Sequence, residues 1–336
     1  MRGVAALLVV VLHSSDYFGA FHFHESFLAV DLFFALSGFV VAEAYQDRLS
    51  SGMRWREFMR LRLIRFYPLY LLGSALGLMK AMAMMRMGDN RMHFTPANTG
   101  GTVAFAVLML PSPFMQDLYP LLPSAWSLGW ELLVNAAYAV VRPWMGPGRM
   151  LIVMAVAGLS LLAALDRLGS VSCGLYLGWE SAWMAASRVG FSFTAGLLIQ
   201  RIPRCRWRLP PSVILAMVFL ALTHDSGAFR AGYELAFVFL VSPALIYFGA
   251  GTEPRGGREA RAYAFLGASS YAIYVLHEGL GQLLEGALKR FAHTPVQAAA
   301  PWGGLALVVG LVAVCAWLDR HYDGPLRHWL GRARKA

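Results

Sequence analysis

Three ionisable residues near the start of the chain stand in or beside long apolar runs. Arg2 leads into a run that carries His13, and a second run, extending to about residue 45, opens on Asp31. Charges in apolar segments of membrane length cost free energy, so each such residue is a candidate for function. Histidine suits the work of a general base or of a nucleophile. A carboxylate such as Asp31 could orient the imidazole, as in a catalytic triad.

Two carboxylates compete for that orienting role. Asp31 opens its run, so its charge could instead stabilise a helix N-terminus. Glu131 follows Trp126-Ser127-Leu128 and lies deeper in its own apolar run, which makes it the better functional candidate on physical grounds. Ser37-Gly38 is interpreted as packing or lining, because glycine lets a helix or a ligand chain approach closely.

Composition indicates an integral membrane protein. The 336 residues are 58% apolar and only 14% charged, against roughly 25% charged residues in soluble domains. The net charge of +10 is interpreted as topological, and no aromatic-interleaved basic patch indicates a nucleic-acid partner. Cys173, Cys205 and Cys315 do not have the spacing of a metal site or a disulfide framework. The loops derived below also put Cys173 and Cys205 on opposite sides of the membrane, so these two cannot pair. We predict no bound metal.

The apolar runs predict an all-α bundle of about ten transmembrane helices in a single domain over 1–336. The bundle occupies 1–318, and 319–336 forms a basic cytoplasmic tail. The first run looks like a signal peptide but has no convincing cleavage site, so it is assigned as an uncleaved span. The spans are placed near 3–19, 27–45, 66–84, 126–141, 150–166, 183–200, 210–223, 232–249, 263–283 and 301–318.

Basic residues fix the orientation of these spans. The arginines concentrate in 46–65, 201–208, 250–262 and the tail, and such loops are cytoplasmic by the positive-inside rule. The number of spans between these loops puts all of them in the cytoplasm only if 101–118 does not cross the membrane. This predicts a re-entrant or outer-surface helix at 101–118. Both termini then lie in the cytoplasm. His13, Asp31 and Glu131 fall in the outer halves of their helices, while Arg2 lies about 16 Å from His13 along a helix.

Arginines at the cytoplasmic end could bind an anionic ligand. Guanidinium groups match phosphate geometry, and Arg62 and Arg65 are three residues apart on one helix face. Most arginines of 46–65 have a simpler explanation as determinants of topology or contacts of lipid headgroups. Late in the ninth span, Tyr271, Tyr274 and His277 could bind a sugar or belong to an interfacial aromatic belt.

These residues resemble a known family in their order along the chain. Arg2-x10-His13 and Val30-Asp-Leu-Phe-Phe-Ala-Leu-Ser-Gly-Phe39 are similar to the opening of the acyltransferase-3 family of membrane acyltransferases. Three further segments are similar to its later motifs: Arg62-Leu-Ile-Arg65-Phe-Tyr-Pro68, Trp126-Ser-Leu-x-x-Glu131 and Ser270-Tyr271-Ala-Ile-Tyr274-Val-Leu-His277. The likeness covers essentially the whole chain.

The resemblance implies transfer of an acyl group, usually acetyl, from cytoplasmic acetyl-CoA to a hydroxyl. The acceptor would be an outward-displayed glycan or lipid-linked oligosaccharide, in a bacterial inner membrane. His13, with Glu131 or Asp31, would be catalytic, and Arg2, Arg62 and Arg65 would bind the donor. Ser37, Trp126, Tyr271, Tyr274 and His277 would bind substrate.

Other functions compete with this one. A secondary transporter would also bury histidines and carboxylates, although no internal repeat is evident. Acyl transfer to a small molecule or antibiotic, or a scaffold without chemistry, are further alternatives. The acceptor, the acyl chain, the oligomeric state and the choice between direct transfer and an acyl-histidine intermediate stay open at this level.

Overall fold

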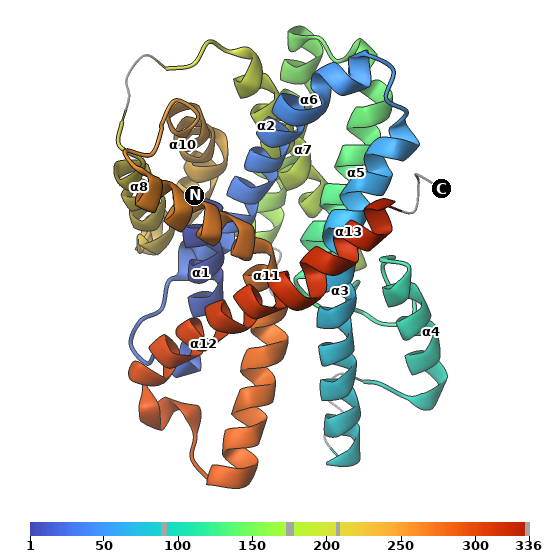
Figure 1. The fold of residues 1–336 in the computed structure, drawn as a ribbon, viewed down its shortest axis with the longest axis vertical. Coiled ribbons are helices and arrows are strands. Elements are labelled where there is room, and N and C mark those ends of the chain that lie inside the picture. Colours follow the sequence, from blue (N-terminus) through green and yellow to red (C-terminus); the bar gives the residue numbers. More distant parts are fainter. Residues whose placement is uncertain (89–92, 173–177, 206–208, 333–336) are drawn as a thin grey trace.

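A computed structural model describes residues 1–88, 93–172, 178–205 and 209–332. Helices make up most of the described part of the chain, which contains no strand (Figure 1). Its helices are α1 (Arg2–His13), α2 (Ala29–Ser50), α3 (Trp55–Arg86), α4 (Pro96–Val107), α5 (Ala125–Val141), α6 (Pro147–Leu168), α7 (Ala182–Arg201), α8 (Pro211–Thr223), α9 (Arg230–Ala236), α10 (Ser242–Gly249), α11 (Gly257–Ala287), α12 (Trp302–Leu318) and α13 (Gly324–Arg332).

The predicted all-α fold is confirmed, and each of the ten predicted spans coincides with a helix or, over 232–249, with α9 and α10 joined by a π-helical turn. Among the described residues, six helical segments are long and apolar enough to cross a membrane, and α1 and α8 are shorter apolar helices. The number of ten crossings therefore stays a prediction. So does the cysteine assignment, because Cys173 lies outside the described residues.

Several helix boundaries differ from the prediction, and those of α1 and α3 bear on the candidate site. α1 ends at His13 and not near residue 19, because Ser14, Ser15 and Asp16 favour turns, and a 3-10 turn follows over Ser15–Tyr17. α3 begins at Trp55, inside the stretch expected to be a loop, since arginine is a good helix former. The early end of α1 places His13 at a helix terminus.

The central helices run side by side. α1 lies along α11, with Gly3 next to Leu266 at one end and His13 next to His277 at the other. Figure 1 shows both helices running down the view, with the N-terminus at the upper end of α1. We call the end of the bundle that holds Arg2 the arginine end, and the opposite end of α1 and α11 the histidine end.

α4 lies on the flank of the bundle beside α3 (Figure 1), and Thr102 is its one buried residue. The helix starts at the capping box of Thr95 and Asn98, near the end of α3 that Arg86 marks. It ends where Tyr67 and Tyr70 donate hydrogen bonds to the carbonyl oxygens of Val107 and Ala106. The chain then turns back and reaches α5 at residue 125 (Figure 1). The helix thus ends at Val107, and its assignment as a re-entrant or outer-surface helix stays a prediction.

Glycines bring α2 and α7 together in the centre of the bundle. A β-carbon at Gly38 would lie 2.0 Å from the carbonyl oxygen of Phe193, and one at Gly196 would lie 2.0 Å from that of Ala35. Each backbone therefore occupies the space that a side chain on the other helix would need. This contact confirms the interpretation of Gly38 as a packing residue.

We expect Gly38→Ala to destabilise the protein by about 1–3 kcal/mol, because α2 and α7 must separate to admit the added methyl group. The apparent melting temperature of the purified protein in detergent measures this. Gly286→Ala is the matched control, since that α11 glycine has open space around it and alanine favours a helix. Equal melting temperatures for the two variants would contradict the close packing.

Candidate functional site

Two histidines meet at the histidine end of the bundle. Nδ1 of His13 lies 2.8 Å from Nε2 of His277, and the two rings are nearly parallel, at 19°. His277 is 1% exposed and lies on α11, 264 positions further along the chain. The pair thus joins the last residue of α1 to the middle of α11.

The backbone of α11 fixes the protons on this pair. Nδ1 of His277 lies 2.8 Å from the carbonyl oxygen of Tyr274, which can only accept a hydrogen bond. Nδ1 of neutral His277 therefore carries the proton, and its Nε2 accepts. It follows that Nδ1 of His13 donates to His277. Nε2 of His13 is then unprotonated, and it has no hydrogen-bond partner among the described residues, so it can act as a base. His13 lines a cavity.

Asp31 forms an ion pair with Arg188 of α7. Nε of Arg188 donates to Oδ1 of Asp31 over 3.1 Å, and its Nη2 donates to Oδ2. The two side chains are 0% and 1% exposed, and the guanidinium also lies over the rings of Phe27 and Trp126. This geometry matches a bidentate arginine–carboxylate pair.

Glu131 is held by a second network. Its Oε1 accepts from Nη2 of Arg62 over 2.6 Å and from the hydroxyl of Ser37 over 2.7 Å. The three residues come from α5, α3 and α2, and all are buried. The network ties three helices together by charge-assisted hydrogen bonds.

These contacts correct three expectations. Neither Asp31 nor Glu131, the two carboxylates expected to orient His13, contacts it, because each is paired with an arginine. The side chain that contacts the His13 ring is His277. Arg62 was expected to face a phosphate together with Arg65, but its burial against Glu131 makes it part of the internal network. Ser37 contacts Glu131 and does not line the cavities described below.

Two small cavities lie one above the other along α1. The cavity toward the arginine end has a volume of about 50 Å³ and is lined by Arg2, Arg65, Glu131 and Tyr271 among others. The cavity toward the histidine end has about 40 Å³ and is lined by His13, Trp126 and Arg188 among others. Val30 and Tyr274 line both, so these two side chains form the partition between them.

The tyrosines expected to bind substrate are also placed at these cavities. The hydroxyl of Tyr274 lies 2.8 Å from that of Ser127, and the hydroxyl of Tyr271 donates to the carbonyl oxygen of Phe66 over 2.6 Å. Both residues are on the α11 face toward α3 and α5, in the interior of the bundle. The alternative of an interfacial aromatic belt does not fit this burial.

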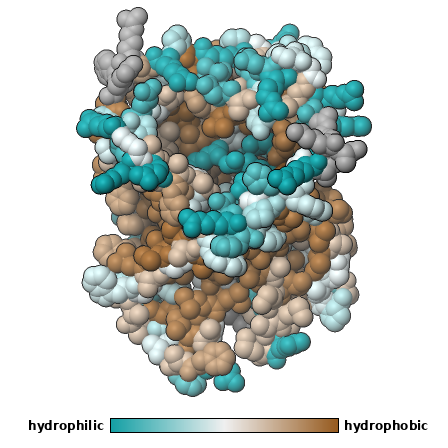
Figure 2. Space-filling model, viewed as in Figure 1, coloured by the Kyte–Doolittle hydropathy of each residue, from teal (hydrophilic) through white to brown (hydrophobic). Residues whose placement is uncertain are grey.

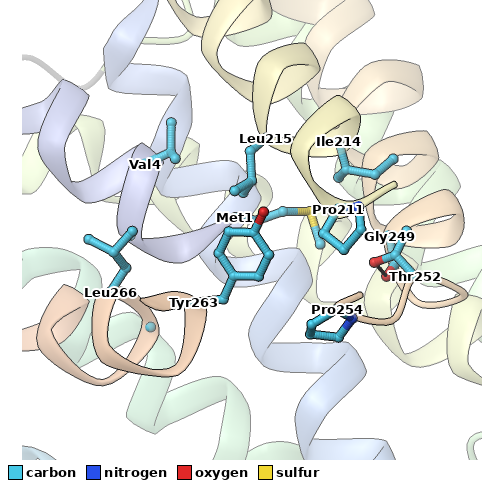
Figure 3. Close-up of a pocket in the computed structure, with 12 residues that line it drawn as sticks. Met1, Val4, Pro211, Ile214, Leu215, Gly249, Thr252, Pro254, Tyr263 and Leu266 are labelled. Atoms are coloured by element: carbon cyan, nitrogen blue, oxygen red, sulfur yellow. Dashed lines mark hydrogen bonds between the residues drawn. The ribbon is translucent and has the colours of Figure 1, made fainter. Parts of the chain in front are cut away.

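A third cavity at the arginine end has a mostly apolar lining. It has a volume of about 220 Å³ and lies between α1, α8, α10 and α11. Figure 3 shows the side chain of Met1 reaching between Leu215 and Pro211, with Tyr263 beside it. The polar side chains of its lining are the hydroxyls of Thr252 and Tyr263.

Arg188 is the residue that the sequence interpretation missed. It is the one charged residue of the predicted span 183–200, and it is almost fully buried. The rule that singled out His13 and Asp31, that ionisable groups in apolar spans are candidates, would also have found Arg188.

Comparison with known proteins identifies the family of this chain. The family model described as "Acyltransferase domain" matches residues 1–320, nearly the whole chain. The chain belongs to this acyltransferase-3 family. It is also 37% identical over 174 residues to "Protein 2 in picA locus" of Rhizobium radiobacter, a match that covers 49% of this chain and 91% of that protein. No solved structure matches.

Family membership and the apolar helices together make the protein a multi-pass membrane acyltransferase. This decides between the enzyme and the transporter interpretations.

Removing one partner of the buried Asp31–Arg188 pair should destabilise the acyltransferase strongly. We expect Arg188→Met to cost about 3–5 kcal/mol, because Asp31 is left as an unpaired buried charge. The double variant Asp31→Leu/Arg188→Met should recover most of that loss, since both charges are gone. Thermal unfolding in detergent measures both, and a double variant no more stable than Arg188→Met would contradict the pairing.

Proposed function

We propose that this acyltransferase moves an acetyl group from acetyl-CoA, bound at the arginine end, to a hydroxyl of a glycan at the histidine end. The observation that carries the proposal is the line of groups along α1. It runs from Arg2 and Arg65, past the Tyr274 partition, to the free Nε2 of His13. A cation site for the donor and a base for the acceptor are thus joined through the interior.

The arginine end has charge available for the phosphates of coenzyme A. Neither Arg2 nor Arg65 forms an ion pair with a residue that the structure describes, and both line the same cavity. Arg65 is exposed, so its guanidinium can meet a ligand from the surface. Arginine binds phosphate oxygens bidentately, which supports an anionic donor here.

The proposed reaction at His13 conserves atoms and charge. Nε2 takes the proton of the acceptor hydroxyl as its oxygen attacks the thioester carbonyl carbon. The new ester C–O bond forms, the C–S bond breaks, and the proton passes from the imidazolium to the thiolate of coenzyme A. His277 stabilises the imidazolium because it accepts a hydrogen bond from Nδ1–H of His13.

The partition bears on how the acyl group reaches His13. Cavities of about 50 and 40 Å³ admit only small groups, so Val30 and Tyr274 must move for a thioester to pass. A relay, in which Nε2 of His13 itself carries the acetyl group, differs in one observable: the protein would become labelled by acetyl-CoA without acceptor.

The proposed setting is a bacterial inner membrane with both termini in the cytoplasm. Basic residues at the arginine end support this orientation by the positive-inside rule. The donor then binds from the cytoplasm, where acetyl-CoA is made. The acceptor hydroxyl is presented from outside.

His13→Ala should reduce acetyl transfer by about 10²–10⁴-fold, the usual contribution of a general base. Transfer of label from acetyl-CoA to glycan, in membranes of a strain that makes the acceptor, measures this. His22→Ala is the control, because His22 is exposed and away from the cavities. Full activity in His13→Ala would contradict the assignment.

His277 is proposed as a positioning residue, which predicts a pattern among its variants. His277→Leu should lower kcat by about 10-fold or more, because His13 loses the acceptor that fixes its tautomer, while KM for acetyl-CoA stays unchanged. His277→Gln should restore much of kcat, since its side-chain oxygen can accept from His13. Equal losses in the two variants would indicate a packing role only.

Arg65→Gln should raise KM for acetyl-CoA by about 10-fold or more, the effect of losing a charge-assisted phosphate contact. Arg56→Gln removes the same charge from an exposed position on the same helix and controls for topology and lipid contact. If both variants change KM alike, the donor is not held specifically by Arg65.

A further inference from the structure

Ser172 lines the same cavity as His13, which we call the His13 cavity, from a segment outside the helices. α6 ends at Leu168, and residues 169–172 continue the chain without helical structure. The other residues that line this cavity lie in helices or within two residues of the start of α2 or α5. We call 169–172 the wall segment. It is the part of the wall that depends most on support from elsewhere in the bundle.

A buried carboxylate on α9 supports the wall segment. Oε1 of Glu234 accepts a hydrogen bond from the hydroxyl of Ser170 over 2.7 Å. Its Oε2 accepts from the backbone N–H of Val171 over 2.8 Å. Hydrogen bonds to an ionised acceptor are roughly twice as strong as those between neutral groups. The position of the wall segment therefore depends on the charge and placement of Glu234.

Among the described residues, Glu234 and a second carboxylate, Glu25, share one arginine. Nε of Arg230 lies 2.9 Å from Oε1 of Glu234 and 3.8 Å from Oε1 of Glu25. The side chain of Arg230 is 45% exposed, whereas both carboxylates are buried, and Oε2 of Glu25 has no hydrogen-bond partner in the described chain. Buried charges that are incompletely compensated cost free energy. This group is therefore held less firmly than the ion pair between α2 and α7, where one arginine serves one carboxylate.

Arg230 also contacts another part of the cavity wall. Its guanidinium carbon lies 5.8 Å from the centre of the Phe27 ring, and that of Arg188 lies 5.5 Å from the same ring. Phe27 lines the His13 cavity. A movement of α9 that withdrew Arg230 and Glu234 would thus loosen the wall at Phe27 and at Ser172 together.

The surface over α11 and α12 is a less favourable way to His13 for a polar molecule. In Figure 2 the lower part of the view, where Figure 1 places these two helices, is mostly hydrophobic. Leu305 and Val309 of α12 are exposed on the surface, as expected of a helix that meets lipid. Polar groups lose free energy when they leave water for such surroundings. The ionisable group on α9 offers a polar alternative at the same end of the bundle.

We infer that Glu234 and Arg230 form a gate, and that the acceptor reaches Nε2 of His13 when the wall segment leaves Glu234. A cavity of about 40 Å³ cannot admit a sugar ring, so a part of its wall must move for the acceptor to enter. Glu234 and Arg230 are positioning residues, because they hold the wall and touch no reacting atom. The identity of the entering molecule rests on the proposed function, whereas the opening of the wall does not.

The reactivity of His13 toward diethyl pyrocarbonate, a reagent that modifies unprotonated imidazole nitrogens, tests the gate. The full-length protein is treated in nanodiscs without acetyl-CoA, and peptide mass spectrometry gives the rate at each histidine. Glu234→Gln should speed the reaction of His13 about 10-fold, because its charge-assisted hydrogen bonds to the wall segment weaken. The milder variant Ser170→Ala should speed it about threefold, since one hydrogen bond is lost.

Two controls accompany these variants. Glu43→Gln removes a carboxylate from an exposed ion pair with Arg204 at the arginine end, and its His13 should react like that of the wild type. His22 is exposed, so its rate calibrates the reagent in every variant. Hydrogen exchange at the amide of Val171 is a second readout, and it should be faster in both gate variants.

Two results would overturn the gate. One is a His13 rate, relative to His22, that neither Glu234→Gln nor Ser170→Ala changes. The other is faster reaction that comes only with faster hydrogen exchange throughout α2 and α7, because that indicates unfolding. A gate that behaves as expected in a protein that transfers no acetyl group would instead contradict the proposed function, so the two failures are distinguishable.

Discussion

The ion pair between Asp31 and Arg188 is the contact on which the centre of the bundle depends. In an apolar interior neither charge can stay unpaired, so α2 and α7 must lie in the one register that joins them. Gly38 and Gly196 let the two backbones approach closely enough for this register. The Arg62–Glu131 network adds α3 and α5 under the same constraint, because those charges are also buried.

Pairing of the carboxylates determines what is left for chemistry. With Asp31 and Glu131 each held by an arginine, His13 has a neutral partner, His277, whose own proton is fixed by a backbone carbonyl. Hydrogen bonds alone therefore decide which ring nitrogen of His13 is unprotonated. Arg2 and Arg65 remain outside these pairs and face the arginine-end cavity. The pairing of buried charges therefore explains both which ionisable residues hold the helices together and which arginines stay available at the arginine end.

The sequence predicted the helices well, because long apolar runs leave little other choice in a bilayer. It also singled out most residues at the centre, including His13, Asp31, Glu131 and Tyr274. It did not predict which of them pair, since His13 and His277 are 264 positions apart and only the packing of α1 on α11 joins them. The ends of α1 and α3 were missed because a serine-rich turn and helix-forming arginines decide them locally.

The most direct test of the central claim is the sidedness of transfer. Labelled acetyl-CoA, which does not cross membranes, is added outside sealed vesicles from a strain that makes the acceptor. In inverted vesicles, whose cytoplasmic face points outward, label should appear as an ester on glycan inside the lumen, protected from added esterase. Right-side-out vesicles should stay unlabelled. Label on glycan at the same face as the donor, or equal labelling in both preparations, would contradict transfer from the arginine end to the histidine end.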